Sequence, residues 1–72
     1  MKPIYKKSQI ITNIEELYNY FIKNIAPCDD NYEYTLINMH NNKQIIVNEN
    51  TIKKHFKLTT NDLMQKVQNA HK

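Results

Sequence analysis

The chain contains no glycine in its 72 residues. Glycine lets the backbone enter left-handed conformations without steric cost and approach a ligand closely. Its absence excludes the glycine-rich phosphate loop, the dinucleotide-binding fingerprint and the nucleophile elbow, because each needs glycine at set positions. Every tight turn must therefore use another residue that tolerates a positive φ, and asparagine, which occurs eleven times, is well suited to this.

A chain of this length forms one domain, residues 1–72, with a small core. All ten basic residues are lysine, and seven acidic residues leave a net charge of +3. The abundance of asparagine, lysine and isoleucine is typical of an AT-rich coding sequence, so mutational bias explains part of the lysine excess. We expect the source to be a low-GC bacterium, or a phage, plasmid or other mobile element of one.

The sequence carries no sign of export or membrane insertion. No apolar run approaches the roughly 18 residues that a membrane-spanning helix needs, and the first residues lack the apolar core of a signal peptide. The single cysteine, Cys28, excludes an internal disulfide. We therefore expect a cytoplasmic protein that has no membrane partner.

The most regular apolar pattern predicts an amphipathic helix after Thr12. Thr12 and Glu15 have the spacing of a capping box. Six apolar residues follow at helical spacing: Ile14, Leu17, Tyr18, Phe21, Ile22 and Ile25. Pro27 is expected to end this helix, because the residue before a proline avoids helical backbone angles. Residues 26–31 then form a loop.

Two β-rich runs, residues 32–40 and 43–48, predict a hairpin turned by Asn41 and Asn42. With a two-residue turn, Leu36 pairs with Val47, and Ile37 pairs with Ile46. Side chains alternate between the two faces of a strand. One face then holds Tyr34, Leu36, Asn38, Ile45 and Val47, and the other holds Thr35, Ile37, Met39 and Ile46. Because both faces are apolar, we expect the second to meet the N-terminal segment or a partner.

The last third of the chain predicts two helices. The first begins at Asn50 and Thr51, and a break at residues 58–60 precedes the second, where Thr59 and Asp62 have a capping-box spacing. The expected order is (β)-α-β-β-α-α. This is a small single α+β domain, in which an amphipathic helix packs on a β-hairpin beside a C-terminal helical pair.

No arrangement of side chains points to catalysis. Cys28 is followed by two carboxylates, which raise the pKa of a thiol and so disfavour the reactive thiolate. His40, His55 and His71 lack the close spacing of zinc ligands. We therefore expect no enzyme activity, no metal and no cofactor. His40 and His55 are candidates for pH sensitivity.

The first functional hypothesis is DNA binding through the lysine-rich C-terminal helices, which have the length of a helix-turn-helix unit. The expected contact residues are Lys53, Lys54, Lys57, Gln65, Lys66, Gln68, Asn69 and Lys72, to which Lys2, Lys6 and Lys7 could be added. The absence of arginine and the position of Asp62 at the start of the second helix count against this hypothesis. Two helices that close the core, with solvated lysines outside, explain the same pattern equally well.

The alternative is a protein-binding accessory subunit or inhibitor of a larger machine, of the kind that mobile elements encode. It would use the hairpin's second apolar face and nearby tyrosines, or an acidic surface that imitates nucleic acid. The expected contact residues are Ile37, Met39, Ile46, Tyr20, Tyr32, Glu15, Glu16, Asp29 and Asp30. A homodimer is compatible with both hypotheses, because a small core with a two-sided hairpin favours association.

Overall fold

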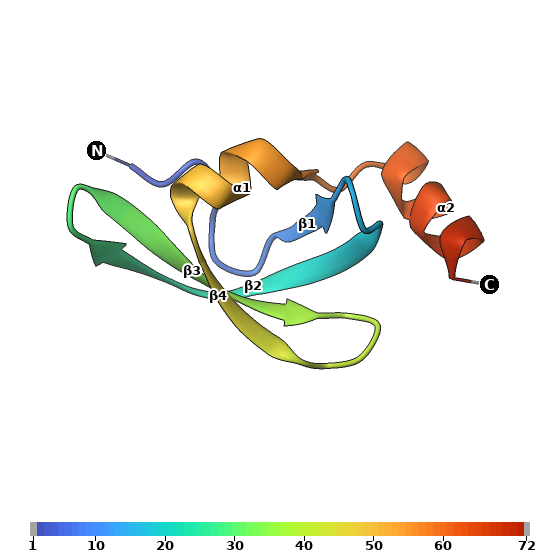
Figure 1. The fold of residues 1–72 in the computed structure, drawn as a ribbon, viewed down its shortest axis with the longest axis horizontal. Coiled ribbons are helices and arrows are strands. Elements are labelled where there is room, and N and C mark those ends of the chain that lie inside the picture. Colours follow the sequence, from blue (N-terminus) through green and yellow to red (C-terminus); the bar gives the residue numbers. More distant parts are fainter. Residues whose placement is uncertain (1, 72) are drawn as a thin grey trace.

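Five strands form one antiparallel sheet in the order β4-β3-β2-β1-β5 (Figure 1). The computed structural model describes residues 2–71. The strands are β1 (Ile10–Asn13), β2 (Tyr18–Cys28), β3 (Asn31–Asn38), β4 (Gln44–Asn48) and β5 (Phe56–Leu58). Helix α1 (Glu49–His55) joins β4 to β5, and helix α2 (Asn61–Ala70) follows β5. The α+β class is confirmed, but the order of the elements differs from the prediction.

The prediction of a helix after Thr12 is wrong. A turn and then strand β2 occupy that part of the chain. Asn13 caps this turn: its Oδ1 accepts hydrogen bonds from the backbone N–H groups of Glu15 and Glu16, both at 2.9 Å. The Thr12 hydroxyl instead bonds to Asn19 Oδ1 at 2.7 Å. The segment that follows is rich in aromatic and β-branched residues, which favour a pleated strand.

Strand β2 is long enough for two kinds of pairing. Its first half lies between β1 and β3, whereas its second half pairs with β3 alone. A register shift between Ile22 and Asn24 marks a bulge between the two halves. Pro27 lies in the second half, at an open edge, where a missing N–H is tolerated. The prediction that Pro27 ends a helix is therefore wrong, and the expected loop shrinks to Asp29 and Asp30.

The predicted β3–β4 hairpin is present, with its register shifted by two residues. Leu36 pairs with Ile45 instead of Val47, and the partner of Ile37 is Gln44. A shift by an even number of residues keeps every side chain on its predicted face. The prediction of the two faces is therefore confirmed for the residues of β3 and β4, although the individual pairs were wrong. Met39 and His40 were expected in the first strand, but they lie in the loop, because β3 ends at Asn38.

Among residues 2–71, four take the left-handed conformation that glycine would otherwise supply: Ser8, Leu17, Asp29 and Asn42, with φ between 55° and 75°. Asn42 lies in the β3–β4 loop, where a positive φ was expected of an asparagine. Asp29 occupies the two-residue turn between β2 and β3. Non-glycine residues pay a steric penalty in this conformation, which asparagine and aspartate reduce through local hydrogen bonds.

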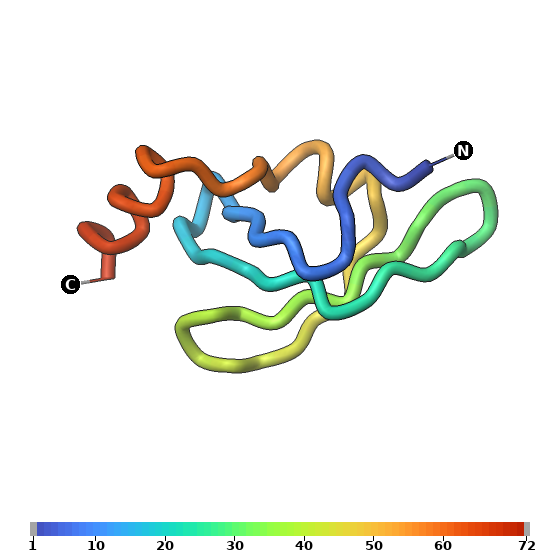
Figure 2. Tube along the Cα trace, turned by 180° about the vertical axis from the view of Figure 1, so that it is seen from behind, coloured from blue at the N-terminus to red at the C-terminus, as the bar shows by residue number. Residues whose placement is uncertain are grey.

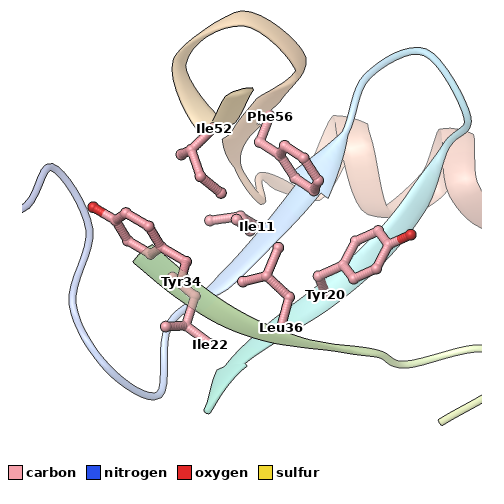
Figure 3. Packing of buried hydrophobic residues seen from close by; sticks show 7 residues of the cluster. All are labelled: Ile11, Tyr20, Ile22, Tyr34, Leu36, Ile52 and Phe56. Carbon is pink, nitrogen blue, oxygen red and sulfur yellow. The ribbon is translucent and has the colours of Figure 1, made fainter. Parts of the chain in front are cut away.

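The core lies between the sheet and α1 (Figure 3). It contains Ile11, Tyr20, Ile22, Tyr34, Leu36, Ile52 and Phe56. The rings of Tyr20 and Phe56 meet edge to face, with their centroids 5.4 Å apart.

Tyr20 was predicted to lie on a protein interface, but it is buried, and Tyr32 is half-buried beside the same core. The prediction placed Tyr20 on the polar side of a helix, whereas in β2 it alternates with Ile22 on the core face.

Both C-terminal helices are present, but β5 separates them, so they are not the expected consecutive pair. Asn48 caps α1 and accepts a hydrogen bond from the Thr51 N–H at 2.9 Å. Thr60, one residue later than predicted, caps α2 and accepts from the Leu63 N–H at 3.3 Å. Figures 1 and 2 show α2 at one end of the sheet, and none of its residues is buried.

Candidate nucleic-acid and protein interfaces

A buried carboxylate holds the N-terminal segment against α1. Glu49, the first residue of α1, is only 3% exposed. Its Oε1 accepts hydrogen bonds from the Tyr34 hydroxyl at 2.8 Å and from the Ile4 backbone N–H at 3.0 Å. Burial and the hydrogen bond to Glu49 raise the pKa of Tyr34 to about 12. Figures 1 and 2 show the N-terminal segment running beside α1 as a result.

Sequence reasoning missed both partners of this contact. Glu49 looks like any surface carboxylate in the sequence, and the helix was expected to begin one residue after it. A weak signal was available, because a carboxylate in the first turn of a helix is favoured by the helix dipole. Nothing in the sequence distinguishes Ile4 from its neighbours.

The contact joins two groups of lysines that are far apart in the sequence. Lys2, Lys6 and Lys7 belong to the N-terminal segment, and Lys53 and Lys54 belong to α1. All five side chains are exposed. We call these lysines of the two tethered segments the basic surface.

Within residues 2–71, no carboxylate lies at ion-pair distance from a lysine of the basic surface. Across residues 2–71, the structure holds one contact of ion-pair geometry, between Nδ1 of His55 and Oε1 of Glu15. The basic surface therefore ends at the C-terminal end of α1, where Glu15 and the exposed Glu16 lie. A lysine without a carboxylate partner can contact a phosphate without first breaking an ion pair.

The other residues predicted to bind nucleic acid lie on different elements. Lys57 is exposed on β5, opposite Thr12 of β1. Exposed polar residues of α2 are Gln65, Lys66, Gln68 and Asn69. Lys72 lies outside the described residues. The predicted contact residues therefore fall on two separate parts of the molecule, because β5 separates the helices that were expected to form one unit.

The sheet face turned away from α1, here called the outer face, is partly apolar. One row of side chains crosses four strands: Ile10, Phe21, Ile37 and Gln44. Ile46 lies on the next row, opposite Thr35, and is 58% exposed. Met39, in the loop beside this face, is 50% exposed. The prediction that Ile37 and Ile46 share a face away from the core is confirmed.

Helix α2 borders a groove of about 280 Å³ beside the β3–β4 loop. Its lining residues are Asn19, Met39, His40, Val67, Gln68 and His71. The His71 ring stacks on Tyr18 with centroids 4.1 Å apart, and its Nε2 donates a hydrogen bond to the Leu17 carbonyl at 2.8 Å. These contacts attach the C-terminal end of α2 to the turn between β1 and β2.

The acidic residues predicted for a protein interface do not form one surface. Glu15 and Glu16 lie in the turn before β2, whereas Asp29 and Asp30 lie in the turn after it. The eleven residues of β2 separate the two turns. An extended strand of that length spans roughly 30 Å. The prediction of a single acidic surface is therefore wrong.

Cys28 lies at the exposed end of β2. The carboxylates of Glu33 and Asp29 raise the pKa of its thiol, which disfavours the nucleophilic thiolate. The rise was predicted from the two aspartates, but Glu33, on the facing strand, contributes most. Within residues 2–71, no three His, Cys, Asp or Glu side chains lie close enough together to hold a metal ion.

Comparisons with known protein families, with curated proteins and with solved structures find no match for this chain. In the described part of the chain, neither helix is long and apolar enough to cross a membrane. The function is therefore inferred from the basic surface and the outer face.

Proposed function

We propose that the protein binds nucleic acid through the basic surface, Lys2, Lys6, Lys7, Lys53 and Lys54. The observation that carries this proposal is the hydrogen bond from the Ile4 N–H to Glu49 Oε1. It holds two lysine-bearing segments together, so that one phosphate backbone can contact both. Counterion release from the phosphates then supplies the binding free energy.

The chemistry of lysine favours binding to the phosphate backbone over reading of the base sequence. Lysine neutralises phosphates as a point charge, but it lacks the guanidinium fork that reads guanine edges. The exposed amides of Gln65, Gln68 and Asn69 on α2 offer further hydrogen bonds to bases. We therefore expect weak sequence preference and a steep dependence of affinity on salt.

Fluorescence anisotropy of labelled single-stranded and double-stranded DNA tests this proposal. Four phosphate contacts would lower the affinity about a hundredfold between about 50 and about 200 mM salt. Lys53→Glu and Lys54→Glu should each weaken binding and flatten its salt dependence. Lys43→Glu is the matched control, because it makes the same charge change in the exposed β3–β4 loop. Absence of binding at the lower salt, or equal losses in all three variants, would refute the proposal.

The exposure of Ile46 and Met39 beside the outer face favours a second function, the binding of a larger protein. The partner would be a folded protein that presents apolar side chains to this face. Burying one such side chain contributes up to about 1.5–3 kcal/mol. An identified partner should be lost with Met39→Lys and retained with Lys53→Glu, whereas DNA binding should respond in the opposite way. Retention of the partner by Met39→Lys would exclude this surface.

A further inference from the structure

Strand β4 is an open edge of the sheet, because it pairs with β3 on one side only. The Asn38 N–H donates to the Lys43 carbonyl at 2.8 Å. Backbone hydrogen bonds of an antiparallel pair alternate between inward and outward residues. The N–H and C=O groups of Gln44 and Ile46, and the N–H group of Asn48, therefore point away from β3, whereas the Asn48 C=O belongs to the first turn of α1. Such a row of backbone groups is a template for a further strand.

The β4 edge lacks the features that usually prevent strand pairing. Charged side chains, proline and very short length protect the edge strands of monomeric proteins. Strand β4 has the sequence QIIVN, without charge or proline, and Ile45 and Ile46 are 37% and 58% exposed. The opposite edge, β5, is only three residues long and carries Lys57. The second half of β2 is also open on one side, but it contains Pro27, so β4 is the edge suited to association.

The charges beside β4 are arranged for pairing with a second copy of the same chain. The Lys23 Nζ donates to Gln44 Oε1 at 3.3 Å at one end of the strand. Glu33 is the cross-strand partner of Asn48 at the other end. Antiparallel pairing about a two-fold axis at Ile46 places Gln44 opposite Asn48 of the second copy. The Lys23 ammonium group above Gln44 and the Glu33 carboxylate of the other copy are then about two strand spacings, roughly 10 Å, apart, so the opposite charges attract each other across the shared edge.

We infer that the protein forms a two-fold symmetric homodimer, in which β4 pairs antiparallel with β4 of a second copy and joins the two five-stranded sheets. The interface is isologous, so each contact occurs twice. Ile46 of one copy lies against Ile46 of the other on the outer face. This inference does not rest on nucleic-acid binding, although a dimer would present two basic surfaces to one strand of DNA.

Sedimentation velocity of the full chain over about 1 to about 200 μM, where weak dimers associate, tests the inference. The wild-type protein should pass from monomer to dimer. Ile46→Lys should weaken the dimer at least about tenfold, because it places like charges opposite each other at the axis. Met64→Lys adds the same charge at an exposed position on helix α2, outside the β4 edge and the outer face, and should still dimerise. A wild-type protein that stays monomeric, or a dimer unaffected by Ile46→Lys, would overturn the inference.

Two further measurements keep the inference falsifiable if a variant fails to fold. Amide hydrogen exchange of the wild-type protein should slow at Ile46 as the concentration rises. Exchange at Ile45, whose N–H faces β3, should not change. A charge exchange tests the orientation: Lys23→Glu and Glu33→Lys should each weaken the dimer, and the double variant should restore it. Concentration-independent exchange at Ile46, or no restoration in the double variant, would exclude the antiparallel β4 pair.

Discussion

The hydroxyl of Tyr34 donates a hydrogen bond to the buried carboxylate of Glu49 at 2.8 Å. The bond links the middle of β3 to the first turn of α1, and the same carboxylate oxygen accepts from the N-terminal segment at Ile4. Three parts of the chain that are distant in sequence therefore depend on one carboxylate. An interior of low polarity makes such a bond strong and its loss costly.

Removal of the Tyr34 hydroxyl should destabilise the protein. Tyr34→Phe keeps the ring but leaves the buried Glu49 carboxylate with one donor fewer. Loss of a hydrogen bond to a charged group costs about 1.5–3 kcal/mol. Urea unfolding measures this loss, with Tyr18→Phe, which keeps the ring that stacks on His71, as the control. Equal stability of the two variants would contradict the role of the Tyr34–Glu49 bond.

The same tyrosine should make the fold sensitive to alkali. Its pKa in the folded protein is raised to about 12 by burial and by the bond to Glu49, against an ordinary value of 10.0. The raised pKa contributes stability that is fully present below pH 10 and is lost as the pH rises through about 12. The contribution is on the order of 2 kcal/mol. The free energy of unfolding of the wild type should fall over this range more steeply than that of Tyr34→Phe, and parallel curves would contradict the prediction.

The failure to predict β2 has a definite physical cause. Tyr20 and Ile22 alternate on the core face as in any strand, but the bulge then moves the next inward residue to Ile25. A spacing of two followed by a spacing of three resembles helical periodicity. Phe21, on the opposite face, completes the pattern because both faces of β2 carry apolar residues. Periodicity alone could not separate the two structures.

The faces of the β3–β4 hairpin could be predicted because strand alternation does not depend on the length of the loop. The register could not, since without glycine the sequence does not specify a two-residue turn. All five lysines of the basic surface were named from the sequence, but their arrangement could not be predicted. The N-terminal segment lies against α1 because the Ile4 N–H bonds to Glu49, and no sequence pattern indicates that contact.

Replacement of Asp29 by glycine should stabilise the protein. Asp29 has a φ of 55°, a conformation that glycine adopts without the steric cost that a Cβ imposes. We expect Asp29→Gly to raise the free energy of unfolding by up to about 1 kcal/mol. Asp30→Gly is the matched control in the same turn, because Asp30 does not have a positive φ. It should lower stability, since glycine increases the entropy of the unfolded chain. Thermal unfolding of both variants measures the two changes in stability. A loss of stability in Asp29→Gly would contradict the prediction.

The contacts of His71 should control the attachment of α2. None of the α2 residues is buried, so few contacts hold the helix in position. His71→Ala removes both the stacking on Tyr18 and the hydrogen bond to the Leu17 carbonyl. Amide hydrogen exchange in α2 should become faster, while exchange in β2 and β3 stays unchanged. Unchanged exchange in α2 would show that other contacts hold the helix.

Neutralising Glu33, on the strand that faces Cys28, should make the Cys28 thiol more acidic. Glu33 and then Asp29 are the largest causes of its raised pKa, so Glu33→Gln should lower that pKa more than Asp29→Asn does. The thiolate is the reactive form, and alkylation by iodoacetamide at a fixed pH should therefore become faster in the same order. Asp62→Asn, on the separate helix α2, makes the same charge change and should leave the rate unaltered. The pH profile of the alkylation rate gives the pKa directly. A profile that is identical for Glu33→Gln and the wild type would show that the charge of Glu33 does not act on the thiol.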